Sequence, residues 1–162
     1  MKYIKTYESK NKPNIIFLDI DGVLIPYKEH SQKIHEYFDE NYKWKKTAVK
    51  YINKLISKFN AKIVITSSYR KKYTKEQITK QMKEEGFNDN VYDMTKVLNN
   101  TPRWEEISKW LEVNDTDKFI IFDDKENENI KNHYPNNFIK CKHIKGLRKK
   151  DYKKAIKLFE NQ

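Results

Sequence analysis

Three short apolar runs divide the chain, and each of them ends in polar residues. The runs are NIIFLDI at residues 14–20, AKIVITSS at 61–68 and KFIIFDD at 118–124. Consecutive apolar residues without alternation are typical of strands that are buried on both faces, as the strands of parallel sheets are. Weaker patterns predict two further strands at 90–94 and 137–144.

Between the strands, apolar residues recur at helical spacing. They do so from Ala48 to Phe59, ahead of the second strong strand. Residues 74–87 predict a helix that Gly86 closes at the position after its C-cap. Residues 151–160 predict an amphipathic helix that follows the last strand.

The helix predicted at 101–112 has the clearest start signals. Thr101 is a candidate N-cap, and Pro102 suits the first helical position. Strands that alternate with helices predict a three-layer α/β fold, with a central parallel sheet and ligands at the carboxyl ends of its strands. The length of 162 residues predicts one domain over 1–162, with its core at about 14–148.

The charge composition bears on the kind of binding partner. Lysine and arginine number 34 against 23 aspartate and glutamate, so the formal net charge is +11. This excess favours polyanionic partners, although the Lys-, Asn- and Ile-rich composition of an AT-rich genome produces the same excess without any function. No apolar stretch approaches the ~18 residues of a membrane span, so we expect a soluble, cytoplasmic protein without membrane contact. The sequence does not predict an oligomeric state.

Acidic residues stand where two of the predicted strands end. Asp19 and Asp21 are two positions apart, which on a strand places both side chains on one face about 6.6 Å apart, far enough to flank one phosphate. Asp123 and Asp124 end the strand at 118–124. Four carboxylates that meet at one edge of a parallel sheet repel one another and need a cation. Mg²⁺ fits best, because it is a hard ion that prefers oxygen ligands and bridges phosphates.

The other polar residues near this edge suit a phosphate. Thr66, Ser67 and Ser68 place three hydroxyl groups after the second strong strand, and Arg70 follows them. Arg103 lies in the first turn of the helix that returns to the 118–124 strand, so this end of the helix opens at the same edge.

Each of these features also has a purely structural interpretation. The Asp-x-Asp-Gly segment could be a turn, the second acidic pair a solvated loop, and Thr-Ser-Ser a set of helix caps. Arg103 could be a surface residue of its helix, and Arg70 a solvated helix start. The structural interpretations do not explain why all three polar groups follow apolar strands.

Taken in order, four segments resemble the four motifs of the haloacid dehalogenase (HAD) superfamily of aspartate-based phosphatases. They are FLDIDGVL, the hydroxyl residue after KIVI, a basic residue ahead of the last strong strand, and FIIFDD. VITSSYR, TPRWEEISKWL and the late KGL further resemble the HAD-type domain of Swiss Army Knife RNA-repair-associated proteins and, more distantly, polynucleotide 3′-phosphatase domains. The resemblance spans roughly residues 14–148.

The resemblance implies a catalytic role for several residues. Asp19 is the implied nucleophile, which forms an aspartyl-phosphate, and Asp21 is the implied acid and base. Thr66 is implied to contact a transferring oxygen, with Ser67 as the alternative. Arg103 takes the basic third-motif position, in which lysine is the more common residue of the superfamily, so Lys96 is its alternative.

The resemblance also implies the metal and substrate contacts. Asp123 and Asp124 are implied to hold Mg²⁺ together with Asp19 and the backbone carbonyl of Asp21. On the substrate side we expect a set of three residues, namely Ser67, Ser68 and Arg70.

Two segments bear on access to the site. HAD proteins usually carry cap insertions where this chain has residues 25–44 and 71–100, and these segments hold at most a helix or two. We therefore expect a capless or lightly capped, open site, which the superfamily tends to combine with macromolecular substrates. Cations alternate with aromatic residues at 43–46, 69–73 and 148–154, as in single-strand binders, although solvated helix faces have the same pattern.

The sequence thus predicts a Mg²⁺-dependent phosphomonoester hydrolase that acts on RNA or DNA ends such as a 3′-phosphate. One alternative is a nucleotidase for free nucleotides. Another is an inactive nucleic-acid-binding module on the same scaffold.

Overall fold

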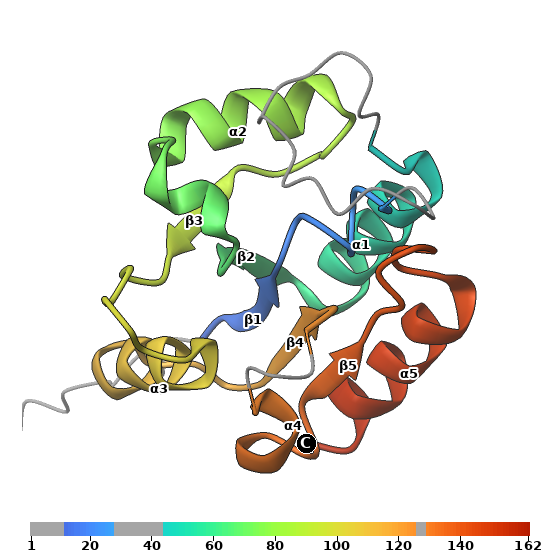
Figure 1. The fold of residues 1–162 in the computed structure, drawn as a ribbon. Coiled ribbons are helices and arrows are strands. Elements are labelled where there is room, and N and C mark those ends of the chain that lie inside the picture. Colours follow the sequence, from blue (N-terminus) through green and yellow to red (C-terminus); the bar gives the residue numbers. More distant parts are fainter. Residues whose placement is uncertain (1–11, 28–43, 126–128) are drawn as a thin grey trace, which may run out of the picture.

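Five parallel strands form one open sheet at the centre of the molecule (Figure 1). The computed structural model describes residues 12–27, 44–125 and 129–162. The strands occur in the spatial order β3-β2-β1-β4-β5. Their bounds are β1 Asn14–Leu18, β2 Ala61–Ile65, β3 Val91–Met94, β4 Phe119–Asp123 and β5 Phe138–Lys140. All five predicted strands are therefore present, and every neighbouring pair is parallel.

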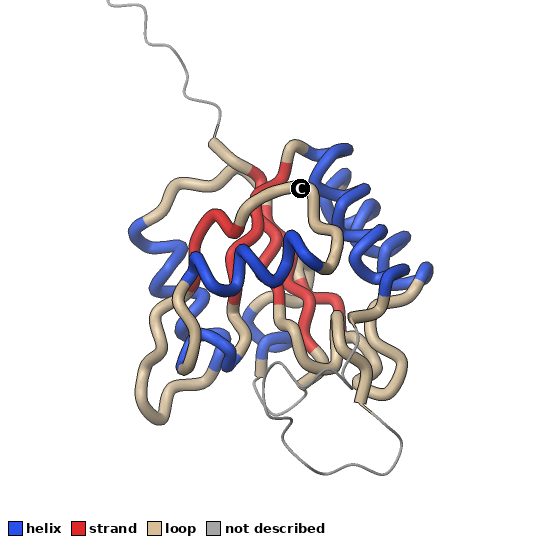
Figure 2. Tube along the Cα trace, turned by 90° about the horizontal axis from the view of Figure 1, so that it is seen from above, coloured by secondary structure: helices blue, strands red, loops and turns tan. Residues whose placement is uncertain are grey.

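Helices cover both faces of the sheet (Figures 1 and 2). Along β1, Ile16 and Leu18 belong to one apolar cluster, whereas Ile15 and Phe17 belong to a second one on the opposite face. The first cluster includes side chains from α1 (Lys46–Phe59), α2 (Lys75–Glu84) and α5 (Lys149–Glu160), and the second includes side chains from α3 (Arg103–Val113) and α4 (Ile130–His133). The predicted three-layer α/β architecture is confirmed.

Aromatic residues fill the α3 side of the sheet. The ring of Phe17 meets Trp110 of α3 edge-on at a centroid distance of 5.3 Å, and it meets Phe119 of β4 in the same way at 5.8 Å. The indole Nε1 of Trp110 donates to a carboxylate oxygen of Asp93 at 2.6 Å. The two contacts of Trp110 fix α3 against β1 and β3, which matters because α3 carries Arg103.

Several predicted boundaries differ from the observed ones. The prediction of Thr101 as an N-cap is wrong, because Pro102 occupies that position and the Thr101 hydroxyl donates to the Asn99 carbonyl at 3.2 Å. The last helix begins at Lys149, two residues earlier than predicted, and the short elements η1 (Ser68–Lys71) and α4 were not predicted. The stop at Gly86 is confirmed, since it follows the C-cap of α2 with a φ of +98°.

The structure describes the two predicted cap segments to different extents. Most of the first one falls on residues 28–43, which lie outside the described residues. The second, 71–100, contains α2 and β3. Within the three described ranges, none of the helices combines the length and apolar character needed to cross a membrane.

Candidate active site

The sheet register aligns three polar residues at the carboxyl ends of β1, β2 and β4. Leu18 of β1 pairs with Ile65 of β2 on one side and with Phe122 of β4 on the other. The next residues of the three strands are Asp19, Thr66 and Asp123. Backbone bonds continue the alignment, because Thr66 N donates to Leu18 O at 3.0 Å and Asp19 N donates to Phe122 O at 3.1 Å. These three residues therefore lie side by side at one edge of the sheet, as the three apolar runs predicted.

Asp21 lies in a turn, not on a strand. Because β1 ends at Leu18, the expectation that Asp19 and Asp21 project from one strand face is wrong. Asp21 instead forms an isolated bridge with Ile25, and Gly22 N donates to Ile25 O at 2.8 Å. Burial, and then the negative charge of Asp19, raise the pKa of Asp21 to about 6.

Gly22 makes room for a carboxylate of the last motif. Its φ of +74° lies in the left-handed region, which favours glycine. A Cβ at this position would lie only 2.3 Å from Asp124 Oδ2. The turn after β1 and the segment after β4 therefore fit together only with glycine here.

Three carboxylates form a compact acidic group. Asp19, Asp123 and Asp124 each offer one oxygen, and these oxygens lie within 4.8 Å of one another. Asp19 is 2% exposed and Asp123 is fully buried, while Oδ1 of Asp124 is buried without a partner among the described residues. Burial raises the pKa of Asp123 to about 6 and that of Asp124 to about 7, and the neighbouring carboxylates add to both shifts. A group of close, desolvated oxygen donors fits a hard divalent cation.

Arg103 provides a positive charge next to these carboxylates. Its guanidinium is 6% exposed, and Nη1 lies 3.0 Å from Asp19 Oδ2 and also pairs with Asp123 Oδ2. Lys96, the alternative, has an exposed side chain in the loop after β3. The predicted direction of α3 agrees with these contacts, since its first turn lies at the carboxyl edge of the sheet.

The three hydroxyl residues after β2 have different surroundings. Thr66 is fully buried, and its Oγ1 has no hydrogen-bond partner among the described residues. Ser67 Oγ accepts from Tyr69 N at 3.3 Å and thereby caps η1. Ser68 is half-buried and lines a cavity of about 460 Å³ beside Arg103. Of the two alternatives for the second motif, Thr66 is the one with an uncommitted hydroxyl.

Arg70 faces inward, toward the protein. Its side chain is 4% exposed and pairs with Glu106 of α3 at 2.8 Å. Nε donates to Ser67 O at 2.7 Å, and Nη1 donates to Thr95 O at 2.7 Å. The other carboxylate oxygen of Glu106 accepts from Leu98 N at 3.0 Å. Arg70 and Glu106 therefore tie η1, the loop after β3 and the first turn of α3 together, and sequence reasoning missed Glu106 altogether.

A family model describing the HAD domain in Swiss Army Knife RNA repair proteins matches residues 15–152. The chain belongs to this family. The match extends from β1 into α5 and includes every residue of the site described above. HAD domains are phosphatases and related hydrolases in general, and they generally use Mg²⁺. Among curated proteins, no match to this HAD domain was found.

Replacement of Gly22 by alanine should disturb the carboxylates of the HAD domain. The new Cβ would displace Asp124, and the left-handed backbone adds a cost of about 1–3 kcal/mol to folding. We expect Gly22→Ala to lower the melting temperature and to abolish any rise in it on addition of MgCl₂. Gly86→Ala is the matched control, since Gly86 also has a positive φ but has no atom within 4 Å of an added Cβ. An unchanged Mg²⁺ response in Gly22→Ala would contradict the steric argument.

The acidic group should make stability depend on pH. The pKa values of Asp123 and Asp124 are higher in the folded HAD domain than the ordinary 3.8, so their protonation favours folding. That contribution is complete below about pH 4 and is lost as the pH rises through about 6 to 7. With a chelator present to remove divalent ions, the free energy of unfolding measured with urea should fall between pH 5 and pH 8. The fall should be smaller in Asp124→Asn, and equal slopes in the two proteins would contradict this assignment.

Proposed function

We propose that the HAD domain is a Mg²⁺-dependent phosphomonoesterase that forms an aspartyl-phosphate on Asp19. The observation that carries the proposal is the position of the Asp19 carboxylate. It is almost fully buried, it pairs with Arg103, and it belongs to one acidic group with Asp123 and Asp124. A nucleophile, a fixed cation and a set of metal-binding oxygens are what phosphoryl transfer requires of a protein.

The reaction divides into two halves. In the first, a carboxylate oxygen of Asp19 attacks phosphorus, the bond to the leaving oxygen breaks, and protonated Asp21 gives its proton to that oxygen. In the second, Asp21 takes a proton from water as the water oxygen attacks phosphorus, which releases inorganic phosphate and restores the Asp19 carboxylate. A pKa of about 6 suits Asp21 to both proton transfers near neutral pH.

Arg103 and Thr66 stabilise the phosphoryl oxygens in this scheme. The guanidinium already lies against Asp19, so it requires little movement to reach an oxygen on the attacked phosphorus. The free hydroxyl of Thr66 donates to another oxygen. Asp19, Asp123 and Asp124 would hold Mg²⁺, which supplies charge neutralisation when it is bound. Arg70 acts indirectly, by holding α3 through Glu106.

The favoured substrate is a terminal phosphate of a nucleic acid, such as a 3′-phosphate. The family description, HAD domain in RNA repair proteins, supports this choice, as does the net charge of +11. A nucleotidase is the second candidate, because the cavity of about 460 Å³ beside Arg103 lies within the usual size range of small-molecule sites.

Asp19→Asn should remove the nucleophile while retaining the size of the side chain. We expect turnover of p-nitrophenyl phosphate with Mg²⁺ to fall at least about a thousandfold, with an unchanged circular dichroism spectrum. Asp115→Asn makes the same chemical change at an exposed surface position and should leave turnover unchanged. Turnover that survives in Asp19→Asn would exclude the aspartyl-phosphate mechanism.

Salt dependence should separate the two substrate classes. A single strand held through about four phosphates loses about 50-fold in affinity between 50 and 200 mM salt, because the slope is about −0.7 per contact. We therefore expect kcat/KM for a 3′-phosphorylated oligonucleotide to fall steeply over this range, and kcat/KM for a 3′-mononucleotide to fall only slightly. Equal salt dependence for the two substrates would favour the nucleotidase.

A further inference from the structure

The excess positive charge of this protein is concentrated on two neighbouring helices. α1 contains Lys46, Lys50, Lys54 and Lys58 and no acidic residue, although the overall acidic content predicts about two in a helix of 14 residues. α5 contains five lysines against Asp151, which is buried, and Glu160. In contrast, α2 and α3 carry cations and acids in similar numbers.

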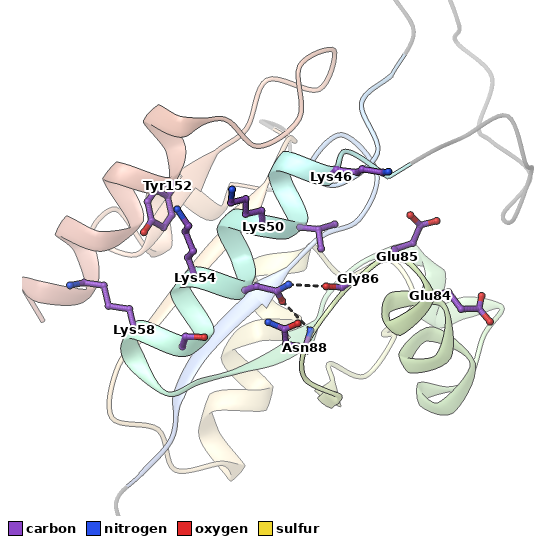
Figure 3. Close-up of a pocket in the computed structure, with 12 residues that line it drawn as sticks. Lys46, Lys50, Lys54, Lys58, Glu84, Glu85, Gly86, Asn88 and Tyr152 are labelled. Carbon is purple, nitrogen blue, oxygen red and sulfur yellow. Dashed lines mark hydrogen bonds between the residues drawn. The ribbon is translucent and has the colours of Figure 1, made fainter.

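The lysines of α1 form a regular row. All four are exposed, and they recur every fourth residue, so they advance in steps of about 6 Å over a total of about 18 Å. Figure 3 shows Lys50, Lys54 and Lys58 extending toward the α5 side, with Tyr152 of α5 beside Lys54, whereas Lys46 extends the other way at the start of α1. Steps of this length are close to the separation of neighbouring phosphates along a single-stranded nucleic acid.

α5 extends this surface next to α1. The rings of Tyr51 and Tyr152 stack across the two helices at a centroid distance of 4.9 Å, and Phe59 packs against Phe159 at 4.6 Å. We call the exposed lysines of α1 and α5, with Tyr152 between them, the basic face. Tyr152 lines the same groove as Lys50 and Lys54, so an aromatic ring stands among the cations.

The basic face is unfavourable for the isolated protein. Like charges four residues apart destabilise a helix, and cations in the first turns of α1 and α5 oppose the helix dipoles. Within the described part of the chain, Lys58 alone of these lysines pairs with a carboxylate, Glu160, at 3.8 Å, and Lys154 donates to the Phe138 carbonyl. A polyanion on this face would relieve the repulsion.

The basic face begins next to the turn that carries Asp21. Lys45, just ahead of α1, donates its backbone N–H to Leu24 O at 2.8 Å, and its Nζ donates to Leu147 O at 3.0 Å. Leu147 N in turn donates to Val23 O at 2.8 Å. Both helices therefore start at the catalytic edge and lead away from it.

We infer that the basic face binds single-stranded RNA and guides its phosphorylated end toward Asp19. This inference extends the proposed function. The delivery of the strand end to Asp19 rests on the proposed function, whereas RNA binding to the basic face does not. Regularly spaced cations with an interleaved aromatic ring are the features that hold a single strand. RNA is favoured over DNA by the family description.

An anionic membrane fits this face less well. A membrane-binding helix inserts large apolar side chains, but the exposed large apolar residues among the described ones are Tyr92, Val97 and Val113, none of which lies on α1 or α5. Glu84 and Glu85 line the opposite wall of the groove, so a strand would follow the α1–α5 side of it.

The test compares Lys50→Gln/Lys54→Gln with a matched control, Lys109→Gln/Lys131→Gln. Both double variants remove two positive charges from exposed helical positions, and the control changes α3 and α4 on the opposite side of the sheet. Binding of a fluorescent 12-nucleotide RNA with a 3′-hydroxyl end is measured by anisotropy between 50 and 200 mM salt. This RNA offers no phosphomonoester, so binding is measured without turnover.

We expect Kd for the RNA to rise about tenfold at 50 mM salt in Lys50→Gln/Lys54→Gln, and the log–log salt slope to become shallower by about 1.4. The control should stay within about twofold of the unmodified protein, and both variants should hydrolyse p-nitrophenyl phosphate normally. Affinity should rise with RNA length up to about four phosphates along the row and then level off.

Three results would overturn the inference. They are equal effects of the two double variants, tighter binding of phosphatidylserine vesicles than of RNA through the same lysines, and binding of DNA but not of RNA. If the unmodified protein does not hydrolyse p-nitrophenyl phosphate, that result would count against the proposed function alone. RNA binding is independent of it, because the RNA used carries no group to hydrolyse.

Discussion

The repulsion between buried carboxylates at one edge of the sheet is the constraint on which the rest of this structure depends. Asp19 and Asp123 follow neighbouring parallel strands in matched register, so the sheet itself forces them together. Arg103 offsets part of their charge from the other side of the edge. Because burial penalises each unpaired charge, these carboxylates stay close together more easily where a cation or a bound proton offsets their charge.

Contacts at two points hold the helix that carries Arg103. Its own helix is anchored by Trp110 against Phe17, and its first turn is anchored by the buried pair between Arg70 and Glu106. All three arginines of the chain pair with carboxylates, the third being Arg148 with Asp151, whereas lysines carry the exposed charge. This division follows from chemistry, since a planar guanidinium satisfies several acceptors in a buried site and an ammonium stays hydrated more easily.

Local patterns in the sequence predicted the strands and the helices between them, because burial on both faces of a strand leaves an uninterrupted apolar run. They also predicted that the acidic residues at the strand ends meet, because parallel strands align their carboxyl ends. The same patterns could not reveal that Arg70 turns inward, since its partner Glu106 lies 36 residues away. They also failed at Asp21, because nothing local shows that β1 ends at Leu18. Long-range contacts and exact strand ends are set by packing, which a single sequence does not display.

Lysine and the acidic residues are distributed unevenly among the helices. An AT-rich genome supplies lysines, but it does not remove acids from one helix and keep them in another. α3 carries three glutamates in 11 residues, whereas the 14 residues of α1 carry none. Together, α1 and α5 carry nine lysines against two acids, which is +7 of the formal net charge of +11. The distribution of charge therefore carries information that the net charge of +11 alone does not.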